Sequence, residues 1–137
     1  RVFPWANDLY PPQQVTDNYA DQSASRFLSF TLANYNDGFP VATDIGSFKP
    51  NSKGLYNMSG NVSEWVNDYY DVRPHRGEPK IDPQGPATGS RHVIRGASWA
   101  LGSRTELRLS YRDAGADGRL DVGFRIARYL DRPGAKP

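Results

Sequence analysis

The sequence predicts one small α+β domain in which more than half of the residues lie in loops. The chain has 137 residues, of which 13 are glycine and 11 are proline, and both residue types interrupt helices and strands. It also contains 6 phenylalanines, 8 tyrosines and 3 tryptophans, whereas disordered chains are poor in aromatic residues. Short segments with helical or alternating apolar spacing lie between the loops, so both helices and strands are expected.

Two short helices are predicted. Segment 22–35 has apolar residues spaced as on one face of a helix, and the turn-forming triplet Asn36-Asp37-Gly38 follows it. A second helix is predicted from Asn61 to about Tyr69. Asn61 would be its N-cap, and Glu64, three residues later, would complete a capping box.

Strands are predicted in the second half of the chain. Segments 92–97 and 123–129 are mainly apolar and read as buried strands, and 107–111 alternates apolar with polar residues as a half-buried strand does. Segments 73–90 and 113–121 are expected to be loops. The tryptophans Trp5, Trp65 and Trp99 are expected in the core.

Charge and composition exclude several classes of partner and cofactor. There are 17 basic and 15 acidic residues, a formal net charge of +2, and no basic stripe interleaved with aromatics, so no nucleic-acid partner is expected. No apolar run is long enough to span a bilayer, and no signal peptide is recognised. The absence of cysteine excludes disulfides and thiolate metal sites in this chain.

Familiar catalytic constellations are hard to build from these residues. The two histidines are His75, in a proline-rich loop, and His92, at the start of a predicted strand. Their spacing gives no support to an iron site of two histidines and a carboxylate, and no serine-nucleophile motif is present. Three arginines in or beside apolar strands are predicted to be structural and paired with acids such as Asp68 or Asp121, an anion clamp being the alternative. They are Arg95, Arg112 and Arg125.

Segment 57–64 carries a possible set of oxygen ligands. Asn57 and Glu64 supply side-chain oxygens, Gly60 permits a sharp turn, and the carbonyls of Gly60 and Val62 can point the same way. Calcium takes six to eight oxygens at ~2.3–2.6 Å. Spacing alone nevertheless favours the simpler interpretation, in which Glu64 is only the capping partner of Asn61.

A second set of oxygens flanks the first predicted helix. Asp21 and Gln22 precede it, and Asp37 to Phe39 follow it, so a cation bound there would tie its two ends together. The simpler alternative is that Asp21 interacts with the helix dipole and that Asp37 forms a turn. Taken alone, the spacing favours that alternative.

Several ordered segments together resemble the formylglycine-generating enzyme (sulfatase-modifying factor) domain family. The resemblance runs from Phe3 to Arg128 and rests on these segments: Phe3-Pro4-Trp5, 18–21, 37–39, 54–65, 82–86, 93–99 and Gly123-Phe124-Arg125. It implies a C-type-lectin-like fold, with the domain at 1–130, its N-terminal part missing, and a tail at 131–137. It also implies two structural calcium sites. With the resemblance, calcium binding is therefore favoured over the capping and turn interpretations of these two segments. One site uses Asp21, Gln22, Asp37 and Phe39, and the other uses Asn57, Gly60, Val62 and Glu64.

The catalytic activity of the family is not expected in this chain. Catalytic members use copper held by two cysteines, and the matching positions here are Leu101 and Glu106. Leucine cannot bind copper, and a carboxylate is a poor ligand for Cu(I). No copper and no formylglycine-generating activity are therefore expected.

The expected function is instead a non-catalytic, calcium-stabilised binding or scaffold module of bacterial origin. Its ligand surface would lie on loops 100–106 and 113–121, with these candidate contacts: Leu101, Ser103, Arg104, Glu106 and Tyr111. The partner would be a protein, a small molecule or the chain's own missing N-terminal segment. An extracytoplasmic location, periplasmic or secreted, is favoured.

Two alternatives stay open. One is a non-haem iron or oxidase-type enzyme completed by a missing segment or a partner. The other is a variable ligand-binding protein of a diversity-generating retroelement, a class that shares this fold. Its diversified stretch would correspond to residues 100–122. The displayed residues would include Leu101, Ser103, Arg104, Leu109 and Tyr111.

Overall fold

The computed structural model describes residues 1–5, 7–72, 81, 83 and 85–128. Several predictions concern positions outside this range: the tail at 131–137, His75, Tyr129 and most of the loop at 73–90. Within the described residues, no helix has the length and apolarity needed to cross a membrane.

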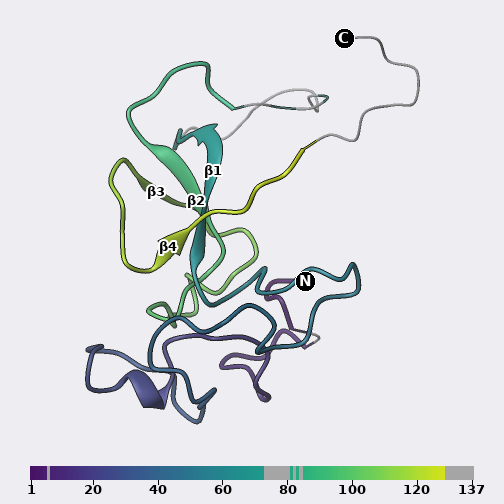
Figure 1. The fold of residues 1–137 in the computed structure, drawn as a ribbon, viewed down its shortest axis with the longest axis vertical. Helices are drawn as coiled ribbons and strands as arrows, with labels where there is room; N and C mark the ends of the chain where they lie inside the picture. Colours follow the sequence, from purple (N-terminus) through teal and green to yellow (C-terminus); the bar gives the residue numbers. More distant parts are fainter. Residues whose placement is uncertain (6, 73–80, 82, 84, 129–137) are drawn as a thin grey trace.

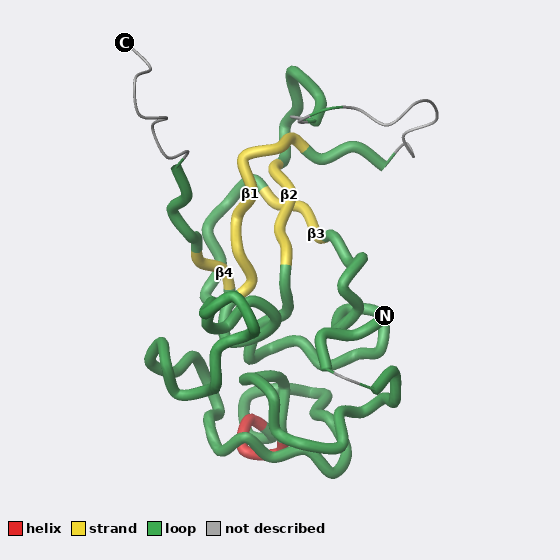
Figure 2. Tube along the Cα trace, turned by 90° about the vertical axis from the view of Figure 1, so that its right-hand side faces the viewer, coloured by secondary structure: helices red, strands yellow, loops and turns green. Residues whose placement is uncertain are grey.

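A small curled sheet occupies one end of the molecule, and loops make up most of the rest (Figures 1 and 2). Its strands are β1 (Ser63–Tyr69), β2 (His92–Arg95), β3 (Asp113–Gly115) and β4 (Val122–Gly123). The spatial order is β3-β2-β1-β4. Strands β1 and β2, and β2 and β3, are antiparallel, whereas β4 runs parallel to β1. The 3-10 turn η1 (Gln22–Ala24) lies at the end opposite the sheet in Figure 2.

The predicted helix at 22–35 is wrong beyond its first turn. Asp21 caps η1 through the backbone N–H groups of Ser23 and Ala24, but the chain then folds back on itself. The Leu32 N–H bonds to the Ala20 carbonyl at 2.7 Å, a long-range pairing that a continuous helix excludes. The apolar residues with helical spacing therefore separate: Leu32 is buried, whereas Phe27 is 66% exposed.

The second predicted helix, at 61–69, is a strand. Asn61 has a left-handed backbone, with φ of 71°, and its side chain bonds to both backbone groups of Thr43 instead of capping a helix. Residues 62–70 include valines, a tryptophan and tyrosines, which suit a pleated, half-buried surface. The register between β1 and β2 shifts between Trp65 and Tyr69, which marks a bulge.

The strand predictions hold in part. Strand β2 confirms the prediction at 92–97 over its first four residues. Segment 107–111 is a series of turns, in which the Leu107 N–H bonds to the Ser103 carbonyl at 3.1 Å. The predicted loop at 113–121 begins with β3. Of the described part of the predicted strand, residues 123–128, only Gly123 belongs to β4, and Phe124 and Ile126 are exposed rather than buried.

Aromatic rings fill the core below the sheet. Phe3 stacks on Trp5 with their centroids 4.7 Å apart, Trp5 meets Tyr19 edge-on at 6.2 Å, and Tyr19 contacts Tyr35 at 5.7 Å. Leu32, Ala97 and Leu107 complete this cluster. The core prediction is thus right for Trp5 and wrong for Trp65 and Trp99, which are only half-buried.

Candidate functional site

The segment from Asn57 to Asn61 is clamped against Asp17 and Asn18. The Asn61 N–H donates to the Asn18 carbonyl at 2.8 Å. A Cβ atom on Gly60 would lie 2.6 Å from that same carbonyl oxygen, so glycine is required for this close approach. Asn57 is left-handed like Asn61, with φ of 49°, a conformation that asparagine adopts more readily than most residues.

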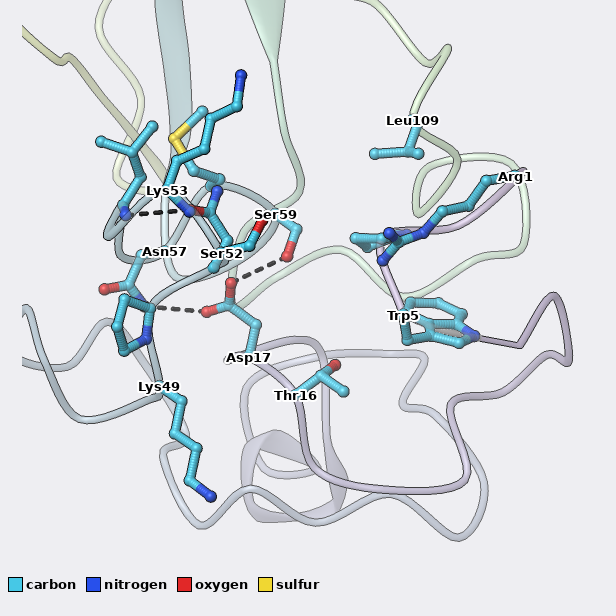
Figure 3. A pocket seen from close by; sticks show the side chains of 15 residues that line it. Arg1, Trp5, Thr16, Asp17, Lys49, Ser52, Lys53, Asn57, Ser59 and Leu109 are labelled. Atoms are coloured by element: carbon cyan, nitrogen blue, oxygen red, sulfur yellow. Dashed lines mark hydrogen bonds between the residues drawn. The ribbon is translucent and has the colours of Figure 1, made fainter.

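Asp17 lies at the centre of this clamp and is 4% exposed. Its Oδ1 accepts from the Asn57 side-chain amide at 2.9 Å and from the Asn18 N–H at 3.0 Å, and its Oδ2 accepts from the Ser59 hydroxyl at 3.0 Å. Figure 3 shows the Asn57 nitrogen turned toward Asp17 and the Asn57 oxygen turned away. That oxygen is buried and has no hydrogen-bond partner among the described residues, so it fits the role of a metal ligand at the 57–64 site.

Glu64, at the other end of this segment, forms an ion pair with Arg125 at 2.7 Å. The guanidinium also donates to the Tyr56 carbonyl at 2.9 Å, so one nitrogen joins Glu64 to the residue preceding Asn57. Glu64 is therefore not a capping partner of Asn61. Arg125 Nε also contacts both carboxylate oxygens, at 3.2 and 3.1 Å. A carboxylate has about four lone-pair sites, so Glu64 keeps capacity for a cation on Oε2.

The predicted arginine pairs are also corrected. Arg125 is paired with Glu64 rather than with Asp68 or Asp121. Arg95 donates to the carbonyls of Leu109 and Tyr111. Arg112 donates to the Asp71 carbonyl and lies over the Tyr70 ring. The ion-pair partner of Asp121 is instead Arg119, whose Nη2 lies 3.0 Å from Asp121 Oδ2.

At the second predicted calcium site, Asp21 joins the two segments through hydrogen bonds. Its Oδ2 accepts from the N–H groups of Asp37 at 2.7 Å and Gly38 at 3.0 Å. Its Oδ1 accepts from both N–H and O–H of Ser23 and from the Ala24 N–H. These five donors saturate a carboxylate that has about four lone-pair sites, so Asp21 fits a metal less well than Asn57 does.

Of Asp21 and Asp37, Asp37 is the carboxylate better suited to bind a metal ion. Its oxygens accept from the N–H groups of Tyr19 and Phe39, each at 3.0 Å. Burial raises the pKa of Asp37 to about 6, and the nearby carboxylates of Asp21 and Asp17 add to this rise. Among the described residues, no three His, Cys, Asp or Glu side chains converge as a metal site, so both candidates depend on amide and carbonyl oxygens. Of the backbone ligands proposed here, Gln22 uses its carbonyl to accept from the Ser25 N–H.

The predicted ligand-facing residues have mixed surroundings. Leu101 packs against the aromatic core, and its carbonyl accepts from the Ala20 N–H. Glu106 closes a turn by accepting from the N–H groups of Gly102 at 3.3 Å and Ser103 at 2.9 Å. Arg104 is exposed, and Tyr111 is half-buried. Loop 101–106 is therefore one compact turn, of which Arg104 is the most accessible predicted contact.

Sequence reasoning missed a cavity of about 540 Å³ beside Asp17. Figure 3 shows it between a wall containing Arg1 and Trp5 and a wall containing Asp17 and Ser59. The motif at 57–64 gave one signal of its position, because Asn57 and Ser59 line it. Arg1, Trp5 and Asp17 come from the N-terminal segment and gave none.

A small curled sheet within a framework of loops defines the class as a C-type-lectin-like domain of the formylglycine-generating-enzyme type. The family model described as the sulfatase-modifying factor enzyme 1-like domain matches residues 1–130. The chain belongs to this family.

Named relatives agree with this assignment. The formylglycine-generating enzyme of Mus musculus is 37% identical over 99 residues, covering 72% of this chain and 25% of the relative. That of Streptomyces coelicolor is 31% identical over 137 residues, covering 96% and 41%. The inactive C-alpha-formylglycine-generating enzyme 2 of Mus musculus is 31% identical over 142 residues, covering 97% and 38%. The chain thus spans between a quarter and about two fifths of these relatives.

Two solved structures share the fold. Treponema denticola variable protein 1 has a TM-score of 0.59 and 32% identity, covering 79% of this chain and 34% of that chain. PvdO from Pseudomonas aeruginosa also has a TM-score of 0.59, with 25% identity, covering 89% and 43%. The C-type-lectin-like, loop-rich expectation is therefore confirmed, apart from the two short helices.

Proposed function

We propose that this chain is a non-catalytic binding or scaffold module that calcium stabilises. The observation that carries the proposal is the pair of positions matching the family's copper cysteines. Leu101 there packs against the core, and Glu106 closes a turn. The chain holds no thiol that could replace them. Its likeness to a relative named as inactive, over 97% of this chain, supports the same conclusion.

The test is conversion of a sulfatase-type cysteine peptide in the presence of Cu(I) and dioxygen, followed by mass spectrometry. We expect no formylglycine product and no tight copper binding. Product formed by this chain would overturn the proposal. Metal analysis of the native, full-length protein tests the rival oxidase-type or iron enzyme completed by a further segment, which requires bound redox metal.

Calcium at the 57–64 site is supported by the buried Asn57 oxygen, which has no hydrogen-bond partner in the part of the chain that the structure describes. We assign as ligands the side chains of Asn57 and Glu64 and the carbonyls of Gly60 and Val62. Calcium at Asp21, Gln22, Asp37 and Phe39 is the weaker part of the proposal, because Asp21 is saturated with donors. Calorimetry with calcium and with a chelator tests both sites, and Asn57→Ala and Asp37→Ala variants separate them. Unchanged melting after chelation would refute the metal part.

A second candidate function is that of a variable ligand-binding protein. The similarity to Treponema denticola variable protein 1 favours it, as does the exposure of Arg104 and Leu109 within the corresponding stretch. A neighbouring reverse-transcriptase gene and a near-identical template repeat are the genomic evidence that this function requires. Their absence from the native locus would exclude it.

The partner is proposed to be a protein strand or a small molecule at the exposed loops. Phe124 and Ile126 support a strand partner, because they follow the edge strand β4 and are 75% and 85% exposed. A further segment of the same protein would suit this position. Co-expression with such a segment and protection of Phe124 from hydrogen exchange and labelling test this, and an extracytoplasmic location is tested by cell fractionation.

A further inference from the structure

The Asp17 carboxylate dictates which way the Asn57 amide faces. A carboxylate only accepts hydrogen bonds, whereas an amide side chain has one donating end and one accepting end. Asp17 Oδ1 lies 2.9 Å from the Asn57 side-chain nitrogen. The opposite amide orientation would place two acceptors against each other, so Asp17 selects the orientation in Figure 3.

This orientation leaves the Asn57 oxygen unpaired. The oxygen is buried, and no described residue donates to it, although an unmet buried acceptor is destabilising. Rotating the amide would not remove that penalty, because Asp17 would then face an acceptor. The neighbouring clamp, in which Asn61 bonds to the Asn18 carbonyl, also keeps the loop from moving away. The oxygen is thus presented to a group that the described residues do not supply.

We propose that Asp17 is a positioning residue for a divalent cation at the 57–64 site. Asp17 does not bind the ion; it holds the Asn57 oxygen in the ligand orientation and adds negative charge behind it. This inference rests on the proposed calcium site. Groups that orient a metal ligand typically contribute about 10–100-fold to metal affinity, which sets the size of the expected effect.

The matched control is Ser59, whose hydroxyl is the other side-chain donor to Asp17, at 3.0 Å. Ser59→Ala removes one hydrogen bond to the carboxylate and the bond that the Ser59 hydroxyl accepts from Tyr19, and it leaves the bond between Asn57 and Asp17 in place. Asp17→Ala removes the acceptor facing Asn57. Asp17→Asn can still accept through its amide oxygen and therefore serves as the conservative rescue.

The experiment is titration of each variant, and of Asn57→Ala, with calcium by calorimetry and with terbium by sensitised luminescence. Near-UV circular dichroism checks the fold. We expect Asn57→Ala to abolish binding at this site, Asp17→Ala to weaken it about 10–100-fold, Asp17→Asn to weaken it less, and Ser59→Ala to match the wild type.

The possible failures are distinguishable. Absence of cation binding that depends on Asn57 in the wild type would refute the proposed calcium site and this inference with it. Wild-type affinity in a folded Asp17→Ala protein would refute only the positioning role. If Asp17→Ala does not fold, Asp17→Asn decides: affinity equal to that of Ser59→Ala overturns the role, and a several-fold loss supports it.

Discussion

Replacing Tyr35 with phenylalanine tests whether one buried hydroxyl organises the centre of the loop framework. The hydroxyl accepts from the N–H groups of Thr16 at 3.2 Å and Asp17 at 3.3 Å, and it donates to the Asp17 carbonyl. Burial raises the pKa of Tyr35 to about 12, so the hydroxyl keeps its proton at neutral pH. The phenylalanine variant would keep the ring in the core and lose all three bonds.

The magnitude follows from which groups water can reach afterwards. Thr16 is exposed, so its N–H can be solvated, whereas Asp17 is 4% exposed and both of its backbone groups would stay unpaired. With about 1–3 kcal/mol for each of these two unmet buried groups, we expect Tyr35→Phe to lower the free energy of unfolding by about 2–6 kcal/mol.

Urea denaturation followed by tryptophan fluorescence measures this change. Tyr19→Phe is the matched control, because the Tyr19 hydroxyl donates to the Ser59 hydroxyl at 3.1 Å and makes no bond to the Asp17 backbone, and its loss should cost about 1 kcal/mol. A Tyr35→Phe loss below about 1 kcal/mol, or one equal to the control, would refute the reasoning.

Three further predictions concern single side chains. Gly60→Ala should destabilise the fold by about 1–3 kcal/mol through the backbone clash, whereas Gly118→Ala, with nothing within 4 Å of the added Cβ, should be neutral in the same denaturation assay. Burial alone would raise the pKa of Asp121, but hydrogen bonds from Arg119 and Ser98 outweigh it and hold the pKa below its usual value. Arg119→Met should therefore destabilise the protein at neutral pH. Its deficit relative to wild type should shrink as the pH falls from the usual range of an aspartate, about 4, through the lowered pKa of Asp121; a pH-independent deficit would contradict this. Glu106→Ala should lose about 1–2 kcal/mol and Glu106→Gln less, because only glutamine can still accept from the turn, and equal thermal melting of both variants would count against that role.

The sequence allowed the family, the loop-rich class and strand β2 to be predicted, because ordered motifs and a short apolar run are local signals. The helices failed for reasons of tertiary structure. Segment 22–35 has helical spacing, but Leu32 is bonded back to Ala20, and this long-range contact outweighs a weak local preference. Segment 61–69 is a strand and not a helix, and the Asn61 side chain bonds to the backbone of Thr43 instead of capping a helix.

The candidate site was predictable only where its residues are close in sequence. Asn57 and Glu64 lie in one motif, so their proximity could be expected. Asp17 lies forty residues before Asn57, and no periodicity connects the two segments. The pairing of Glu64 with Arg125, sixty-one residues away, is likewise a product of the sheet, in which Glu64 of β1 lies opposite Gly123 of β4.

The two ends of the loop between Asp21 and Asp37 are hydrogen-bonded to each other, and this has a consequence for protein engineering. Asp21 accepts hydrogen bonds from the Asp37 and Gly38 N–H groups, and the Gln22 N–H donates to the Tyr35 carbonyl. These bonds hold the two ends of the loop together without using the residues between them. Residues 25–27, in the turn directly after η1, are exposed. Each doubling of loop length adds only about 0.6 kcal/mol to the free-energy cost of closing a loop. The exposed turn at residues 25–27 is therefore a suitable place to insert an epitope or a fluorescent tag while the rest of the domain keeps its shape.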